Sequence, residues 1–190
     1  MFNLTVYFER NFVKEYKMSK KASKIVEEFS KFKGLEKSLI RKICIGTELS
    51  KLGYIGLKQK ITQKLRNNEK LSKEEIVEYR EYPKKGIEIL SSKYKKEYDD
   101  IVVLGIIREH AERLDGKGFP SGLAGEAILD STYIASICIW FIEETSKRKT
   151  IWEIVHKLER DTGMVPKAIK DDFIKFLSQK SDKINEILNN

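Results

Sequence analysis

Apolar residues recur three or four positions apart along almost the whole sequence, which is the spacing that places them on one face of an α-helix. The alternation of apolar and polar residues that marks a half-buried β-strand is nearly absent. Only residues 2–8 alternate weakly, and a short extended start is expected there. With 190 residues, the chain is long enough for a full-sized core. The pattern predicts a single all-α domain over residues 1–190, built from roughly eight to ten helices.

Residues with specific backbone preferences mark the ends of the expected helices. Gly34 is a typical helix stop, and Ser72 followed by Glu75 has the pattern of a capping box. Thr150 is placed to cap a helix, and Pro166 is expected at a first helical position, where its missing N–H is not needed. The expected segments are 12–32, 35–49, 58–66 (a short helix or turn), a helix opened by Ser72, a helix that starts at or near Pro83 and runs to Lys96, 101–113, a helix from Asp130 or Ser131 to Thr145, 151–160, 166–179 and a last one opened by Ser181.

Segment 101–113 is strongly apolar and is expected to be the central, most buried helix. It leads into residues 110–125, where four glycines and Pro120 lie close together. Glycine tolerates positive φ and proline fixes φ, so this stretch is expected to be a tight, specific loop. Asp115 is expected to accept a hydrogen bond from a backbone N–H two residues on. Phe119, at the tip, is expected either to plug a core or to present an aromatic face to a partner.

This loop resembles the HHExxDGxGYP signature of HD-GYP domains, which are bacterial phosphodiesterases of the second messenger cyclic di-GMP. The residues that carry the resemblance are Arg113, Asp115, Gly116, Gly118, Phe119 and Pro120, with phenylalanine in place of the usual tyrosine. Residues 121–126 continue like the family's RGLKGEE segment. The resemblance spans about residues 13–177 and implies an all-α HD/HD-GYP-like bundle.

Members of this family resemble metal-dependent hydrolases, in which two or three iron or manganese ions lower the pKa of a bound water and hold the scissile phosphate. Such a site needs many ligands, most of them imidazoles. The sequence contains two histidines, His110 and His156. This count alone argues against a histidine-rich binuclear centre.

The positions that correspond to the family's metal ligands carry other residue types. The HDxGKxG motif falls on residues 50–56, so Ser50 and Lys51 replace its histidine and aspartate. An ammonium group at a ligand position would repel a divalent cation. The degenerate metal positions are Ser50, Lys51, Tyr82, His110, Ala111 and Ile139. The backbone-shaping glycines and prolines are retained, so we expect a preserved scaffold with no metal, no other cofactor and no catalytic residue.

The polar residues near the loop also have structural interpretations. His110 is expected as a capping or core histidine, and Glu112 as a structural ion-pair partner beside Arg113. The basic run 147–149 lies where the family carries a phosphate-facing arginine and lysine; it is expected either to contact a phosphate or to be a solvated helix end that complements the helix dipole. The candidate ligand or partner contacts are Arg113, Asp115, Lys117, Phe119, Lys147 and Arg148.

The favoured hypothesis is a catalytically inactive regulatory or protein-interaction module in cyclic di-GMP signalling. Its partner would be a diguanylate cyclase (GGDEF) domain or another signalling protein, bound through the DGxGFP loop with Phe119 as anchor, and cyclic di-GMP itself could bind without being cleaved. One alternative is a residual phosphodiesterase in which His110, Glu112 and Asp115 hold one Mg²⁺ or Mn²⁺.

A second alternative, a basic nucleic-acid-binding protein, rests only on the net charge of +8. The lysines are spread along nearly every segment, without an aromatic-interleaved patch, and this alternative is disfavoured. No apolar run is long enough to span a membrane, and no secretory leader is recognisable, so the cytoplasm is the expected location.

Overall fold

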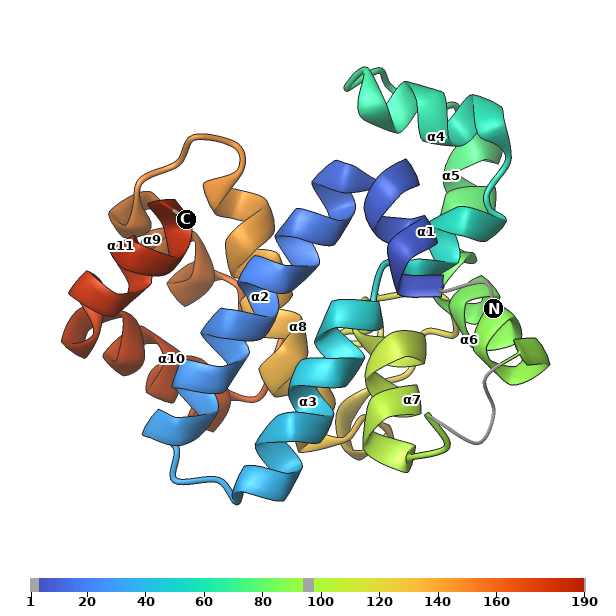
Figure 1. Cartoon of the computed structure of the whole chain (residues 1–190). Coiled ribbons are helices and arrows are strands. Elements are labelled where there is room, and N and C mark those ends of the chain that lie inside the picture. The colour runs from blue at the N-terminus through green and yellow to red at the C-terminus, as the bar shows by residue number, and fades with distance from the viewer. Residues whose placement is uncertain (1–3, 94–97, 190) are drawn as a thin grey trace.

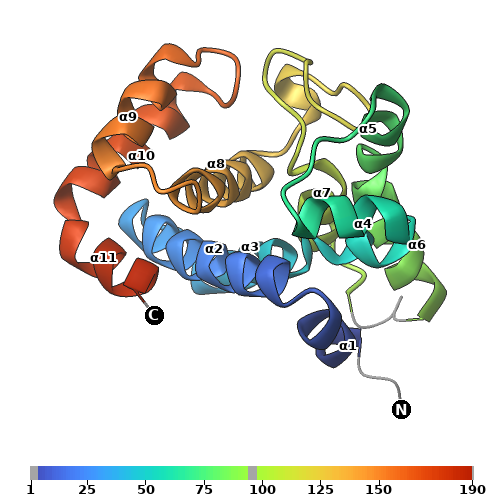
Figure 2. The ribbon, with the colours of Figure 1, turned by 90° about the horizontal axis from the view of Figure 1, so that it is seen from above.

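Helices α2 (Val13–Phe32) and α8 (Asp130–Thr145) pack against each other across the middle of the molecule (Figure 1). The C-terminal helices lie on one side of this pair and helices α4 to α6 on the other (Figure 2). This computed structural model describes residues 4–93 and 98–189, and within those ranges the chain forms helices and no β-strand. The all-α prediction is confirmed.

The remaining elements are shorter helices. They are α1 (Leu4–Asn11), α3 (Lys37–Leu49), the 3₁₀ helix η1 (Leu52–Gly56), α4 (Gln59–Arg66), α5 (Lys73–Tyr79), α6 (Tyr82–Lys93), α7 (Ile101–Glu109), the 3₁₀ helix η2 (Gly125–Ala127), α9 (Ile151–Arg160), α10 (Lys167–Gln179) and α11 (Ser181–Asn189).

Two apolar clusters hold these helices together. The larger one joins α2, α3 and α8 to the C-terminal helices, with Phe29, Phe141, Phe173 and Phe176 fully buried at its centre. The smaller one joins α1, η1, α4 and α6 to α7 and includes the fully buried Tyr82. The candidate functional residues lie where these two clusters meet, around α7, α8 and η1.

Several sequence signals mark real helix ends. Gly34 ends α2 with a φ of +72°, a backbone conformation that glycine adopts without a Cβ clash. Ser72 and Thr150 each form a capping box with the glutamate three residues on. The Asp100 carboxylate accepts hydrogen bonds from the first backbone N–H groups of α7.

Other predicted boundaries were wrong. Residues 4–8 are helical and not extended, because Phe8, Phe12 and Tyr16 follow one another at helical spacing and pack together; residues 2–3 lie outside the described ranges. The helix expected to start at or near Pro83 does begin there, at Tyr82, and its expected residues 94–96 lie outside the described ranges. Helix α7 ends at Glu109 and not at residue 113, because the chain turns there into the glycine-rich loop.

The most buried helix is α8, not α7: nearly every residue from Thr132 to Ile142 is buried, whereas Ile101 at the start of α7 is 76% exposed. Neither Asp130 nor Ser131 caps α8, whose N-cap is Leu129, and Pro166 is an N-cap residue one position before α10. No helix of the described residues is long and apolar enough to cross a membrane.

Candidate functional site

A close backbone contact brings the first site residues together. At Gly53 in η1, a Cβ atom would lie 1.7 Å from the carbonyl oxygen of Tyr82, so η1 packs directly on the first turn of α6. This contact is possible only because glycine has no side chain. It places Lys51, just before η1, beside the buried phenol ring of Tyr82.

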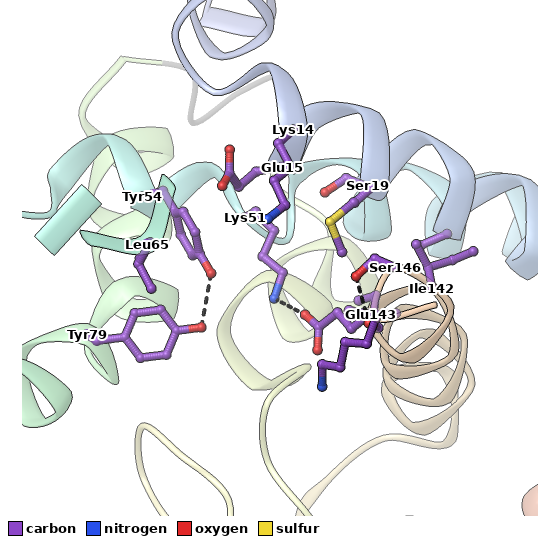
Figure 3. Close-up of a pocket in the computed structure, with 14 residues that line it drawn as sticks. Lys14, Glu15, Ser19, Lys51, Tyr54, Leu65, Tyr79, Ile142, Glu143 and Ser146 are labelled. Atoms are coloured by element: carbon purple, nitrogen blue, oxygen red, sulfur yellow. Dashed lines mark hydrogen bonds and ion pairs between the residues drawn. The ribbon is translucent and has the colours of Figure 1, made fainter. Parts of the chain in front are cut away.

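Lys51 is the centre of a buried polar network. Its side chain is buried, and its Nζ donates a hydrogen bond to Oε1 of Glu143 at 2.6 Å (Figure 3). The same Nζ donates a hydrogen bond to the hydroxyl of Tyr82 at 3.1 Å. The Tyr82 hydroxyl lies 2.6 Å from Nε2 of His110, and Nδ1 of His110 lies 3.0 Å from the carbonyl oxygen of Ile106. The network therefore links the end of α3 to α6, α7 and α8.

The charges of these groups follow from burial and from each other. Burial acts to lower the pKa of Lys51, but the adjacent Glu143 carboxylate outweighs it, and the pKa of the lysine lies well above its usual value. Burial, and then the Lys51 ammonium, lower the pKa of His110 to about 3, so its imidazole is neutral at physiological pH. Burial also raises the pKa of Tyr82, which keeps its hydroxyl protonated.

These protonation states fix which group donates and which accepts in each hydrogen bond of the network. Nδ1–H of His110 donates to the Ile106 carbonyl, which leaves Nε2 as the acceptor for the Tyr82 hydroxyl. The Tyr82 oxygen in turn accepts from Lys51, which also donates to Glu143. A neutral core histidine at position 110, next to the end of α7, agrees with the structural role predicted for it.

Five of the six predicted metal positions line one hollow of about 230 Å³. They are Lys51, Tyr82, His110, Ala111 and Ile139. The sixth, Ser50, is buried outside this hollow, and its hydroxyl has no hydrogen-bond partner among the described residues. The sequence comparison missed Glu143, which also lines the hollow; it lies four residues after Ile139 and so on the same face of α8, which is the signal that could have identified it.

The residues present do not fit a metal ion. Within the described part of the chain, no group of three or more histidine, cysteine, aspartate or glutamate side chains is placed to hold one. The three side chains that would hold the single metal ion of a residual phosphodiesterase are each engaged elsewhere. His110 is bonded to Tyr82 and Ile106, and the Glu112 carboxylate accepts from the backbone N–H groups of Ser121 at 2.7 Å and Leu123 at 3.1 Å.

Glu112 therefore does not form the predicted ion pair with Arg113. The guanidinium of Arg113 instead bridges Asp115, with Nε to Oδ1 at 3.1 Å, and Asp161, with an Nη to Oδ1 distance of 2.8 Å. The Asp115 carboxylate also accepts from the backbone N–H of Lys117 at 3.1 Å, as predicted for a turn opener. Arg113 and Asp115 thus help to attach the glycine-rich loop to the connection between α9 and α10.

A family model for the HD domain matches residues 9–132, which is more than half of the chain. The chain belongs to the HD domain family. Among curated proteins, it is similar to the cyclic di-GMP phosphodiesterase response regulator RpfG of Xanthomonas campestris pv. campestris (strain 8004), with 31% identity over 112 residues. The matched region covers 59% of this chain and 27% of the relative, so this HD domain chain spans only about a quarter of that protein's length.

Two candidate contact residues of this HD domain lie at the tip of the loop. Phe119 is half-buried: its ring centre lies 6.1 Å from that of Tyr79 and 6.0 Å from that of Tyr82, and the Arg80 guanidinium lies over its ring. Its ring therefore contributes to packing, and part of its surface is exposed to solvent. Lys117 projects outward, with 82% of its side chain exposed.

The basic run 147–149 follows α8, and two of its three members are engaged in ion pairs. Lys147 and Lys149 contact the two carboxylate oxygens of Glu144 at 2.6 Å and 2.5 Å, and Lys157 of α9 contacts the same carboxylate at 2.9 Å. Arg148 is exposed and has a φ of +60°. Lys147 also lines a second hollow of about 220 Å³, which lies beside Lys51 and Glu143 (Figure 3).

Glu144→Gln is expected to lower the free energy of unfolding by about 2 kcal/mol at pH 7, because the Glu144 side chain is almost fully buried against three ammonium groups. Burial acts to raise its pKa, but these lysines outweigh it and lower the pKa to about 2. The stabilisation is therefore fully present above the unfolded-state pKa of roughly 4.3 and is lost as the pH falls toward 2.

Urea unfolding at pH 7 and pH 3 measures this effect. The difference between the wild type and Glu144→Gln should shrink at the lower pH, whereas Glu126→Gln, at an exposed position, should match the wild type at both. An equal loss of stability at both pH values would show that the charge of Glu144 does not contribute.

Proposed function

We propose that the chain, as a single domain over residues 1–190, is a catalytically inactive HD-GYP-like module in bacterial cyclic di-GMP signalling. The observation that carries the proposal is the Lys51–Glu143 ion pair, whose lysine stands at the position where the resemblance places the family's metal-binding aspartate. A divalent ion would be repelled there by the ammonium group, and without a metal there is no water of lowered pKa to attack a phosphodiester.

Two further observations support a regulatory role in this pathway. The DGxGFP sequence is complete and its loop is fixed, with backbone hydrogen bonds from Leu114 to Met164 and from Asp115 to Gly163. The relative from Xanthomonas campestris is named as a cyclic di-GMP phosphodiesterase response regulator. We propose that the loop binds a diguanylate cyclase (GGDEF) domain or a comparable signalling protein, with Lys117 and Phe119 as contacts and Arg113 and Asp115 holding the loop in place.

Lys117→Glu is expected to weaken binding of a GGDEF-domain partner about tenfold, because the proposed contact loses its ammonium group. The melting temperature should change little, because this side chain is 82% exposed and its ion pair with Asp115, at 4.0 Å, is loose. The measurement is a titration by biolayer interferometry, paired with a thermal melt. Lys175→Glu, an equal charge reversal on the exposed side of α10, is the matched control. Equal binding by the wild type and both variants would show that the loop is not the docking site.

Phe119→Ala is a less specific test, because the ring also packs against Tyr79 and Tyr82. We expect this variant to lose both partner binding and some thermal stability. A variant that keeps full binding would show that the aromatic ring is not the anchor.

A second experiment tests the absence of catalysis and the binding of the nucleotide. Calorimetric titration with cyclic di-GMP is combined with iron and manganese analysis and with a product assay on the same sample. We expect no linear dinucleotide and no GMP; if the nucleotide binds, Lys147 and Arg148 are the proposed phosphate contacts. Turnover that rises with added manganese would establish the residual phosphodiesterase instead.

A further inference from the structure

The side chains around Lys51 come from four segments that are distant in the sequence. Lys51 follows α3, Tyr82 begins α6, His110 ends α7, and Glu143 lies near the end of α8. Backbone hydrogen bonds within helices cannot connect these segments to one another. Apart from apolar packing, the polar network centred on Lys51 is what joins them at this point.

We infer that the Lys51 ammonium is a built-in replacement for a metal cation, holding these four segments together as a bound ion would. The ammonium supplies a positive charge in the wall of the hollow, and Glu143 supplies the balancing negative charge. The inference rests on the proposed function for the placement of Lys51 at a metal-ligand position, but it does not depend on whether the loop binds a partner.

The surroundings of Lys51 suit an ammonium group better than a hydrated divalent ion. Its Nζ lies 5.2 Å from the ring centre of Tyr82 and 5.9 Å from that of Tyr54, distances at which aromatic faces attract a cation. The hydroxyl of Tyr82 and one carboxylate oxygen accept two of its three N–H groups. The neighbouring imidazole is neutral and already accepts a hydrogen bond, so it is not available to a second cation.

The two partners of the ion pair differ in burial, and this difference gives a distinct prediction. The side chain of Lys51 is 10% exposed and that of Glu143 is 37% exposed. Removing Glu143 leaves a buried cation without its counter-charge, whereas removing Lys51 leaves a carboxylate that water can reach. The loss of stability should therefore be larger for the glutamate variant.

The test is a double-mutant cycle followed by thermal melts. Glu143→Leu is expected to lower the melting temperature by about 10 °C, and Lys51→Met by about half of that. The double variant Lys51→Met/Glu143→Leu, which replaces the pair with apolar side chains, is expected to melt within roughly 3 °C of the wild type. EDTA or added Mn²⁺ should leave the melting temperature of the wild type unchanged.

Three results would overturn the inference. One is a Lys51→Met variant that is as stable as the wild type or more so. Another is a double variant whose loss is the sum of the two single losses, which would show no coupling between the two charges. The third is a rise of several degrees in the melting temperature of the wild type with Mn²⁺. The first two results would leave the proposed function standing, because neither partner binding nor turnover enters these measurements, whereas stabilisation by Mn²⁺ would count against both.

Discussion

Gly53→Ala is expected to lower the free energy of unfolding by more than about 4 kcal/mol, because its new methyl group has no room beside the main chain of α6. The added methyl carbon would lie 1.7 Å from the carbonyl oxygen of Tyr82 and 2.8 Å from the backbone nitrogen of Gly86. Both are main-chain atoms of α6, so neither can rotate away as a side chain would. The clash must separate η1 from α6, and that separation also removes Lys51 from Tyr82.

Thermal melts followed by circular dichroism measure this effect. Gly105→Ala, at another enclosed glycine, is the matched control, because the nearest atom to its added Cβ is 3.7 Å away. That variant should be as stable as the wild type or slightly more stable, since alanine favours the helix by up to about 1 kcal/mol. A Gly53→Ala protein that melts within two or three degrees of the wild type would contradict the close contact.

Glu112→Ala is expected to cost about 3 kcal/mol and to loosen the glycine-rich loop. Glu112 is only 3% exposed. Its carboxylate accepts hydrogen bonds from the backbone N–H groups of Ser121 and Leu123 on the far side of the loop. Truncation leaves both donors without their charged acceptor. Hydrogen exchange of the Leu123 amide should become much faster, and urea unfolding should report the loss of stability.

Glu112→Gln separates hydrogen bonding from side-chain packing. Glutamine keeps one acceptor oxygen of similar position but turns an NH₂ group toward the second donor, so an intermediate loss is expected. Unchanged exchange at Leu123 in the alanine variant would show that the loop is held by its other contacts alone. Those contacts are the backbone bonds to Gly163 and Met164 and the Arg113 bridge to Asp161.

Local features of this protein were predictable from its sequence. The capping boxes at Ser72 and Thr150, the end of α2 at Gly34 and the Asp115 turn all depend on residues within a few positions of one another. Helical spacing predicted the all-α fold for the same reason. Where the local signal was weak or divided, as at residues 4–8 and at the start of α8, the predicted boundaries were wrong.

The candidate site was predictable only in part. The structure brings five of the six positions named from the family's motifs to one hollow. The comparison of motifs did not find Glu143, and it assigned Glu112 to the wrong partner. Both errors concern side chains whose partners lie far away along the chain or across a loop.

By itself, the sequence determined the helices, their caps and the tight glycine-rich loop, because these follow from interactions between near neighbours. Only the tertiary structure decided that the ammonium of Lys51 is neutralised by Glu143, 92 positions later, and that Arg113 joins Asp115 to Asp161. The partner of a buried charge is whichever opposite charge the packed helices bring within hydrogen-bond distance, and that distance is fixed by the packing of α8 against the rest of the molecule.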